Sequence, residues 1–553
     1  MDAVLSRTQR LRLAPDLSSL TPGERAAVRE LLAAGERLNR VYMQQRHAQA
    51  ASVADYLARR PELSKQSDLF WMNNGPIATT LNNAREPFLT VEPETPAKNM
   101  YPPGTTQAVM DAFLAAHPER RADILDDRTL VLAANATSLR RALSALDRHP
   151  ALETLHPGLR ARLRAQATYL SIPYSVAYAD DLFFVADRLN AAADDVAGGD
   201  AAFARYLRLR ARDLLADDYE GGDAAWVTGR FTGHLNAQIG AYETYDDSLY
   251  GVKTFFALSL LVRDTLRSSE LNGALEDIQR VEDALPYQHH RRVRSDIPVG
   301  VYNIIADFGQ ARGTNTATIL PNEAYLAQQY GRTILMRGNI LLNDEIFAET
   351  ERAFAAAVVD EEAHDLRPEG GFYRTLWHEI GHYCGVNLTS DGRELDAALQ
   401  DTADLYEEMK ADLVSLTSAR ILHDRGRLTD AQLQAIYASG IRRMLQKNQP
   451  RRDQPYQTMQ LMQWNWFLDK GALTFENGRL RIHYDRYPAA VESLLHEVLA
   501  IQYNGDRAAA NAFVLHWTQW RPDLHEVIAQ RMRQAERTRF SLVTYAALDD
   551  TAH

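Results

Sequence analysis

Strand-like sequence is confined to one short window in the middle of this chain. Three runs rich in β-branched and aliphatic residues, 299–305, 316–320 and 333–336, follow one another with Gly and Pro between them. Before and after this window, residues 106–285 and the chain beyond about residue 345 have the apolar spacing of helices. The sequence therefore predicts an α+β protein that is predominantly helical and contains one small β core.

The length of the chain favours two cores. At 553 residues it is well beyond the roughly 250–300 residues at which a single hydrophobic core stops growing. We therefore expect two lobes, or one elaborate domain with two halves. The first clear helix is expected to begin at Thr21 and Pro22, since Thr is a good N-cap and Pro suits the first helical position.

Charge and composition narrow the class of partner. The formal net charge is −12, and such an acidic chain repels both phosphate backbones and anionic lipid. Nucleic acid and membrane are therefore not expected partners, and no stretch reaches the roughly 18 apolar residues needed to cross a bilayer. The one cysteine, Cys384, excludes an internal disulfide. We expect a soluble cytoplasmic protein, a monomer or weak dimer; an exported form whose leader has been removed stays open.

The sequence His378-Glu379-Ile380-Gly381-His382 has the pattern of a catalytic metal site. Two histidines four residues apart on a helix point to the same side, so both imidazoles can bind one zinc ion at about 2 Å. Glu379 follows the first histidine and can act as general base on a water at the metal. The pairs His496-Glu497 and His525-Glu526 begin in the same way but lack the second histidine, so only one copy of the motif is complete.

A catalytic zinc site needs a third protein ligand, and the helix predicted at 404–416 offers one. Leu405, Met409 and Leu416 form a buried stripe with Glu408 and Asp412 one turn apart beside it. A carboxylate next to an apolar face is costly unless it is paired or binds a cation.

We therefore expect Glu408 to be the third ligand and Asp412 to accept the free N–H of a ligand histidine. Glu407 is the rival ligand, and the alternative reading is a solvated acidic face paired with Lys410. Two histidines and one carboxylate favour one Zn²⁺ per chain over cobalt or manganese.

The motif at 378–382, followed by Glu407-Glu408-Met409-Lys410-Ala411-Asp412, resembles the dipeptidyl-peptidase III family of zinc exopeptidases. Glu243–Gly251 resembles the substrate strand of that family, and Ile297–Val301 resembles its Gly-containing segment. Phe70–Pro76 and Asn99–Pro102 resemble its shorter bacterial members. The resemblance covers most of the chain from about residue 15, and its motifs are specific in combination.

The resemblance implies two lobes around a deep cleft, with zinc on the helical lobe and a β core in the other. The lower lobe would comprise residues 1–263 and 293–340, and the zinc lobe residues 264–292 and 341–553. The implied activity is the release of dipeptides from the N-terminus of short peptides, with Glu379 as general base.

The resemblance also implies residues that hold the substrate. Glu243 and Asp396 match carboxylates that bind the α-amino group of the peptide. Tyr245 matches a tyrosine that contacts the peptide backbone, and Asn303 is a looser match to an asparagine in the same role. Fixing the ammonium group sets how far the scissile bond lies from the metal.

One departure from the family concerns the helix expected at 454–462. Tyr456 stands where the family has a His that helps to stabilise the oxyanion, and Gln460 stands where many members have an Arg. A tyrosine can donate a hydrogen bond but brings no cationic form near neutral pH. Tyr456 and Tyr245 are the candidate oxyanion donors.

Two alternatives to a peptidase follow from this departure. One is a zinc hydrolase or lyase that acts on a small non-peptide substrate. The other is a catalytically weak homologue that binds peptides without turnover, although binding alone does not require the general base Glu379.

Overall fold

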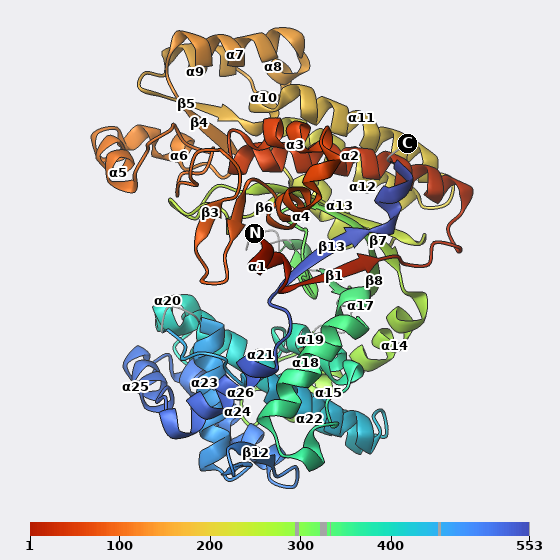
Figure 1. Ribbon diagram of the computed structural model, residues 1–553, viewed down its shortest axis with the longest axis vertical. Coiled ribbons are helices and arrows are strands. Elements are labelled where there is room, and N and C mark those ends of the chain that lie inside the picture. The colour runs from red at the N-terminus through yellow and green to blue at the C-terminus, as the bar shows by residue number, and fades with distance from the viewer. Residues whose placement is uncertain (294–297, 321–328, 332, 452–454, 552–553) are drawn as a thin grey trace.

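The computed structural model describes residues 1–293, 298–320, 329–331, 333–451 and 455–551. Of the segments named above, Ile297 and Gln454 lie outside the described residues. The described chain forms two parts, each with its own large hydrophobic core, and Figure 1 shows one part above the other with the sheet nearer the upper one. The expected fold class, helix-dominated α+β with two lobes and one small β core, is confirmed.

The upper part of Figure 1 holds most of residues 1–263, which belong to the lobe called the lower lobe above. It contains the N-terminal helices and two small strand pairs. Its longer helices are α2 (Pro22–Arg46), α3 (Ala50–Ala58), α4 (Ser64–Asn73), α5 (Gln107–Ala116), α7 (Ala136–Arg148), α11 (Ala179–Val196), α12 (Ala201–Ala216) and α13 (Glu220–Thr228). The shorter helices are α1 (Asp2–Leu5), α6 (Arg121–Ile124), α8 (Ala151–Leu155), α9 (Leu159–Ala165) and α10 (Tyr174–Ala177). The strand pairs are β2 (Ile77–Thr79) with β3 (Arg85–Pro87) and β4 (Thr129–Ala133) with β5 (Tyr169–Pro173).

The lower part is helical apart from one hairpin, β11 (Leu473–Glu476) with β12 (Arg479–Ile482). Its helices are α14 (Thr265–Leu275), α15 (Ile278–Asp283), α17 (Gly338–Leu341), α18 (Asp344–Ala357), α19 (Pro368–Gly381), α20 (Leu395–Leu399), α21 (Ala403–Asp424), α22 (Asp430–Met444), α23 (Pro455–Asp469), α24 (Tyr487–Asn504), α25 (Arg507–Trp517) and α26 (Val527–Ala535).

The main sheet has five strands in the order β6-β7-β8-β10-β9. The three runs expected to be strands are confirmed as β8 (Val299–Gly309), β9 (Ala317–Leu320) and β10 (Thr333–Arg337). The pairing of β10 with β8 is parallel, and the other neighbours in the sheet are antiparallel.

The confinement of strands to the middle window was wrong. β6 (Leu235–Glu243) and β7 (Phe255–Arg263) supply two of the five strands, although both lie in the region expected to be helical. Almost every residue of β6 and β7 is buried, because helices cover the sheet. A short strand buried on both faces has no alternation of apolar and polar residues, so its pattern does not distinguish it from a buried helix.

Helix α2 lies across β7 and β8 and positions them, with α11 packed on its other side. It begins where expected: the Thr21 side chain accepts from the Glu24 backbone N–H, and the Glu24 carboxylate accepts from the Thr21 N–H. This capping box satisfies two of the backbone donors that a helix start leaves without partners.

The two ends of the chain meet in the upper part. Strand β1 (Thr8–Leu13) pairs in parallel with β13 (Phe540–Tyr545), as Figure 1 shows. Val543 and Tyr545 belong to the core of the upper part, whereas residues 341–553 were expected to lie with the helical lobe. The strand β13 therefore departs from that grouping, and the other lobe boundaries stay predictions.

Two glycines bring the helices of the lower part close together. A Cβ at Gly370 of α19 would lie 2.2 Å from the Ala435 carbonyl oxygen of α22, and one at Gly381 would lie 3.0 Å from that of Ala411 in α21. Any side chain at Gly370 would collide with backbone, so α19 can pack this closely against α22 only with glycine there. In the part of the chain that the structure describes, no helix is both long and apolar enough to cross a bilayer.

Candidate metal centre and adjoining cavity

Helices α19 and α21 bring His378, His382 and Glu408 together. One potential ligand atom from each of the three lies within 4.8 Å of the other two. The two imidazole ring centres are 5.0 Å apart, as expected for residues one turn apart on one helix face. The close contact of Gly381 with Ala411 lets α21 approach α19 closely enough for the Glu408 carboxylate to reach both rings. Two histidines and a carboxylate form a donor set that suits zinc.

His378 is held from behind by Asp412. The Nδ1–H of His378 donates to Asp412 Oδ1 at 2.7 Å, and Arg374 Nη1 donates to the same oxygen at 2.9 Å. Arg443 Nε reaches the second oxygen, Oδ2, at 3.1 Å. Burial opposes the ionised form of Asp412, but these cationic neighbours outweigh it and hold its pKa well below the usual range. The orientation of the His378 ring is thereby fixed.

His382 is held in the same way by Glu407. Its Nδ1–H donates to Glu407 Oε1 at 2.9 Å, and the buried ammonium of Lys410 lies 2.8 Å from the same oxygen. Burial disfavours the Glu407 carboxylate, but Lys410 and His382 more than compensate and lower its pKa to about 2. Of the two adjacent glutamates, Glu408 therefore faces the ring nitrogens that are free to bind a metal, and Glu407 orients a ring.

The geometry between His378 and Glu408 requires a positive charge. Glu408 Oε2 is buried and has no hydrogen-bond donor in the described part of the chain, yet it lies 3.2 Å from Nε2 of His378. A neutral imidazole that donates from Nδ1 presents a lone pair at Nε2, so two lone pairs would face each other. Either a proton on Nε2 or a metal ion between the two atoms removes the repulsion. Burial lowers the pKa of His378, but Asp412 and Glu408 outweigh burial and raise it to about 9.

Glu379 is partly buried beside this group and has no hydrogen-bond partner among the described residues. The two incomplete copies of its motif lie in different surroundings. His496 and Glu497 are about half exposed on α24, with 61% and 47% of their side chains accessible. His525 is fully buried against two tryptophan rings, and its Nδ1 accepts the backbone N–H of Arg521.

Tyr456, at the start of α23, reaches the same carboxylate from another side. Its hydroxyl donates to Glu408 Oε1 at 2.8 Å, and burial together with that carboxylate raises the pKa of Tyr456. Gln460, one turn further along, is buried and accepts from Gln446 Nε2 at 2.6 Å. Of the two departures noted in the sequence, Tyr456 therefore lies at the candidate metal centre and Gln460 is engaged in packing.

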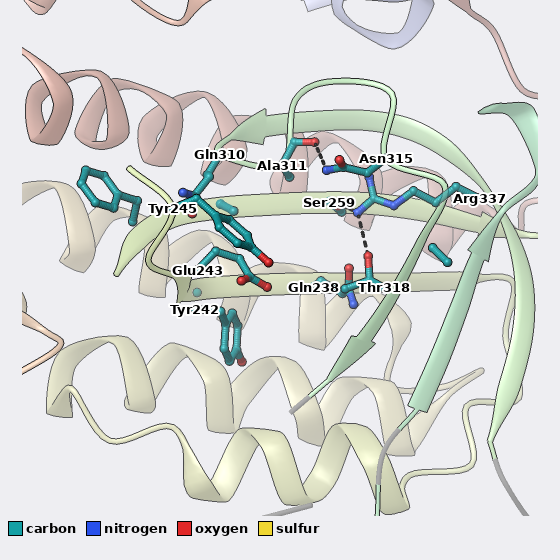
Figure 2. Close-up of a pocket in the computed structure, with 14 residues that line it drawn as sticks. Gln238, Tyr242, Glu243, Tyr245, Ser259, Gln310, Ala311, Asn315, Thr318 and Arg337 are labelled. Atoms are coloured by element: carbon teal, nitrogen blue, oxygen red, sulfur yellow. Dashed lines mark hydrogen bonds between the residues drawn. The ribbon is translucent and has the colours of Figure 1, made fainter. Parts of the chain in front are cut away.

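A cavity of about 280 Å³ is lined by residues of β6, β7, β9 and β10, and Figure 2 shows Glu243 and Tyr245 towards one side and Arg337 towards the other. Tyr245 is 84% exposed. The Glu243 carboxylate, then burial, and finally Glu408 raise the pKa of Tyr245. The Glu408 carboxylate thus lies near enough to Tyr245 to disfavour the ionised form of its hydroxyl.

Two residues matched by the resemblance are not brought to this cavity. Asn303 in β8 pairs with Val262 of β7, and Val262 pairs with Leu235 of β6. Leu235 is the first residue of β6, whereas Glu243 is the last. Eight residues of strand separate that level from Glu243, or roughly 26 Å at 3.3 Å per residue. Asp396 is exposed in the first turn of α20 and does not line the cavity.

Several residues at the site were not anticipated. Arg374 and Arg443 share the Asp412 carboxylate, and Arg337 of the cavity pairs with buried Asp307 at 2.8 Å. Arg374 could have been found from its spacing, because it lies one turn before His378 on the same helix. Arg443 and Arg337 come from distant segments, and no local pattern marks them.

A curated protein resembles part of this chain in sequence. No family profile matches the chain. It is 27% identical over 349 residues to Nudix hydrolase 3 of Arabidopsis thaliana, which is 62% of this chain and 44% of that protein. The match thus spans under half the length of that curated relative.

Two solved structures share the arrangement. Dipeptidyl-peptidase III from Caldithrix abyssi has a TM-score of 0.83 at 22% identity and covers 100% of both chains. Dipeptidyl-peptidase III from Corallococcus sp. strain EGB has a TM-score of 0.74 at 22% identity, covering 100% of this chain and 97% of that one. The chain therefore has the dipeptidyl-peptidase III fold along its whole length.

Proposed function

We propose that the protein is a zinc-dependent exopeptidase that releases dipeptides from the N-terminus of short peptides. The observation that carries the proposal is the group of His378, His382 and Glu408, whose potential ligand atoms lie within 4.8 Å of one another. His378, His382 and Glu408 would hold the ion, and Asp412 and Glu407 would orient the two rings. When bound, zinc would polarise the scissile carbonyl and lower the pKa of a water molecule.

The remaining chemistry belongs to side chains of this protein. Glu379 would take a proton from the attacking water while the water oxygen bonds to the carbonyl carbon. The same carboxyl group would then deliver that proton to the amide nitrogen as the C–N bond breaks, so the amine leaves neutral. The hydroxyls of Tyr456 and Tyr245 are the candidate donors to the oxygen that becomes negative. The Tyr456 hydroxyl donates to the proposed ligand Glu408, and the Glu408 charge raises the pKa of Tyr245, which supports a place for both hydroxyls near the reacting carbonyl.

The adjoining cavity supports a peptide with a free amino terminus. Glu243 offers a partly buried carboxylate to the α-ammonium group, and Tyr245 lines the same cavity. Holding the ammonium at a fixed point would place the second peptide bond at the catalytic group, which favours release of a dipeptide. Asp396 and Asn303 remain proposed contacts of the substrate from the family resemblance alone.

A hydrolase of small non-peptide compounds is the second candidate. Two observations favour it: a tyrosine occupies the position of the family's cleft histidine, and the matched plant relative is named a Nudix hydrolase. This candidate keeps the same proposed ligands and the same general base. It differs in the bond that is broken, so product analysis distinguishes the two.

The deciding experiment incubates zinc-reconstituted protein with an unbiased mixture of short peptides and identifies the products by mass spectrometry. We expect products shortened by two residues at the N-terminus. Glu379→Gln should lose turnover while it keeps its zinc content, because the general base is removed but no ligand is. Glu497→Gln is the matched control, since Glu497 follows a histidine on another helix and is half exposed.

Two results would overturn parts of this proposal. Equal turnover by the wild type and Glu379→Gln would exclude Glu379 as the base. Peptides left intact by fully zinc-loaded protein would favour the second candidate, hydrolysis of a small non-peptide compound.

A further inference from the structure

A second cavity, of about 290 Å³, lies behind the candidate metal centre and is lined by four arginines and no acidic residue. We call it the arginine cavity, and its arginines are Arg367, Arg374, Arg442 and Arg443. They come from the segment just before α19, from α19 itself and from the last turn of α22. The lining also includes the apolar residues Ile346, Phe347 and Leu366.

The positive charge of the arginine cavity is mostly uncompensated. Arg374 and Arg443 share a single carboxylate, Asp412, which His378 also uses. Arg367 and Arg442 have no ion pair within 4 Å among the described residues. The C-terminal end of α22 contributes only about half a negative charge near Arg442 and Arg443.

Arg442 is the least satisfied of the four. Its Nε is buried without a hydrogen-bond partner in the described part of the chain. Burial and the neighbouring Arg443 both lower its pKa, and the attraction of Glu536 only partly offsets them. Glu536 is paired with Lys447, and it makes no ion pair with Arg442 within 4 Å among the described residues. A guanidinium held in this position disfavours its own charge unless an anion joins it.

The arginine cavity adjoins the 280 Å³ cavity that contains Glu243, and one short segment separates the two. Thr314 and Thr316 line the arginine cavity, whereas Asn315 between them lines the cavity that holds Glu243. Alternate residues of an extended segment point to opposite sides, which explains this division. The two cavities are thus separated by one thickness of backbone.

We propose that the arginine cavity binds an oxyanion, a carboxylate or a phosphate, that carries a short apolar part. The guanidinium groups supply paired donors that suit both groups, and Ile346 and Phe347 add apolar side chains to the lining. The oxyanion can come from a free small molecule or from the C-terminal carboxylate of a bound peptide. The first source does not depend on the proposed peptidase function, and the second rests on it.

The test measures binding by titration calorimetry, so it does not depend on turnover. Inorganic phosphate probes the free anion, with full-length zinc-reconstituted protein. A tetrapeptide ending in leucine is compared with its C-terminal amide in the Glu379→Gln background, where it should stay intact. We expect at least one oxyanion probe to bind, and Arg442→Ala to weaken that binding at least tenfold. If peptide binding requires both the free carboxylate and Arg442, the ligand of the cavity is the C-terminus of a peptide. If phosphate binding requires Arg442, the ligand is a free anion.

Arg205→Ala is the matched control, because it removes one positive charge from an exposed position on α12 outside the cavity. Arg367→Ala repeats the test at an exposed side chain, so the proposal is still tested if Arg442→Ala does not fold. The proposal is overturned if neither probe binds, if both cavity variants bind as the wild type does, or if Arg205→Ala weakens binding as much as they do.

Discussion

Replacement of Asp412 by Asn should weaken zinc binding without removing a ligand. Three donors converge on this buried carboxylate: His378 Nδ1 at 2.7 Å, Arg374 Nη1 at 2.9 Å and Arg443 Nε at 3.1 Å. An amide has one acceptor oxygen and brings two hydrogens of its own, so it cannot serve all three. The His378 ring would lose the partner that fixes its orientation and its basicity.

The magnitude follows from such orienting contacts in metal sites. Loss of the partner of a ligand histidine costs about 10- to 100-fold in metal affinity, which corresponds to about 1.4–2.8 kcal/mol. The apoprotein should also lose stability, because Arg374 is buried with 7% of its surface exposed and would lack a charged partner. The stabilisation by a fixed excess of zinc should fall by the same 1.4–2.8 kcal/mol or so, since it follows the ratio of free zinc to the dissociation constant.

The affinity is measured by competition with a chromophoric zinc chelator, and stability by denaturant unfolding with and without zinc. Asp424→Asn is the control, since Asp424 lies on the same helix with 63% of its side chain exposed. A dissociation constant for Asp412→Asn within twofold of the wild-type value would refute the idea that Asp412 supports a metal ligand.

Three further predictions concern other parts of the molecule. Tyr456→Phe removes the hydroxyl 2.8 Å from Glu408 Oε1 and should lower turnover on the order of 100-fold at unchanged zinc content; unchanged turnover would exclude Tyr456 as an oxyanion donor. Burial raises the pKa of Asp217 from 3.8 to about 7. Between these pH values the folded state keeps the Asp217 proton and the unfolded state releases it. The free energy of unfolding that this proton contributes is therefore lost as the pH rises from about 4 to 7. The variant Asp217→Asn cannot ionise at this position. Its free energy of unfolding, measured with denaturant, should exceed that of the wild type by up to about 4 kcal/mol at pH 8 but by almost nothing at pH 4. An equal gain at both pH values would contradict this. Gly35→Ala would place a Cβ 2.2 Å from the Phe308 ring and should cost about 1–3 kcal/mol in unfolding free energy, whereas a wild-type thermal midpoint would show that the ring can move aside.

The candidate metal centre could be predicted from sequence because its geometry is local to two helices. The spacing of His378 and His382 fixes their common side, and the buried stripe of α21 directs Glu408 towards them. Glu407 and Glu408 were harder to separate, since neighbouring residues on a helix both border the same stripe. The pairing of Glu407 with Lys410 and His382 distinguishes them, and the spacing of residues along α21 alone does not show which glutamate contacts which histidine.

The sheet was only partly predictable. Strands β8, β9 and β10 carry β-branched residues between turn signals, but almost every residue of β6 and β7 is buried, so these two strands show no alternation. Asn303 illustrates another limit. A residue can match a family position in sequence, yet its level along the sheet depends on strand register, and the register places it at the opposite end of the sheet from Glu243.

The pairing of β1 with β13 sets a condition on biosynthesis. More than 500 residues lie between these two strands, so the ladder cannot close until β13 has left the ribosome. The same ladder brings residues 540–545 back from the helical part to the upper part, so the polypeptide crosses between the parts once more after α26. Removal of residues 540–545 should therefore loosen the attachment of the first strand.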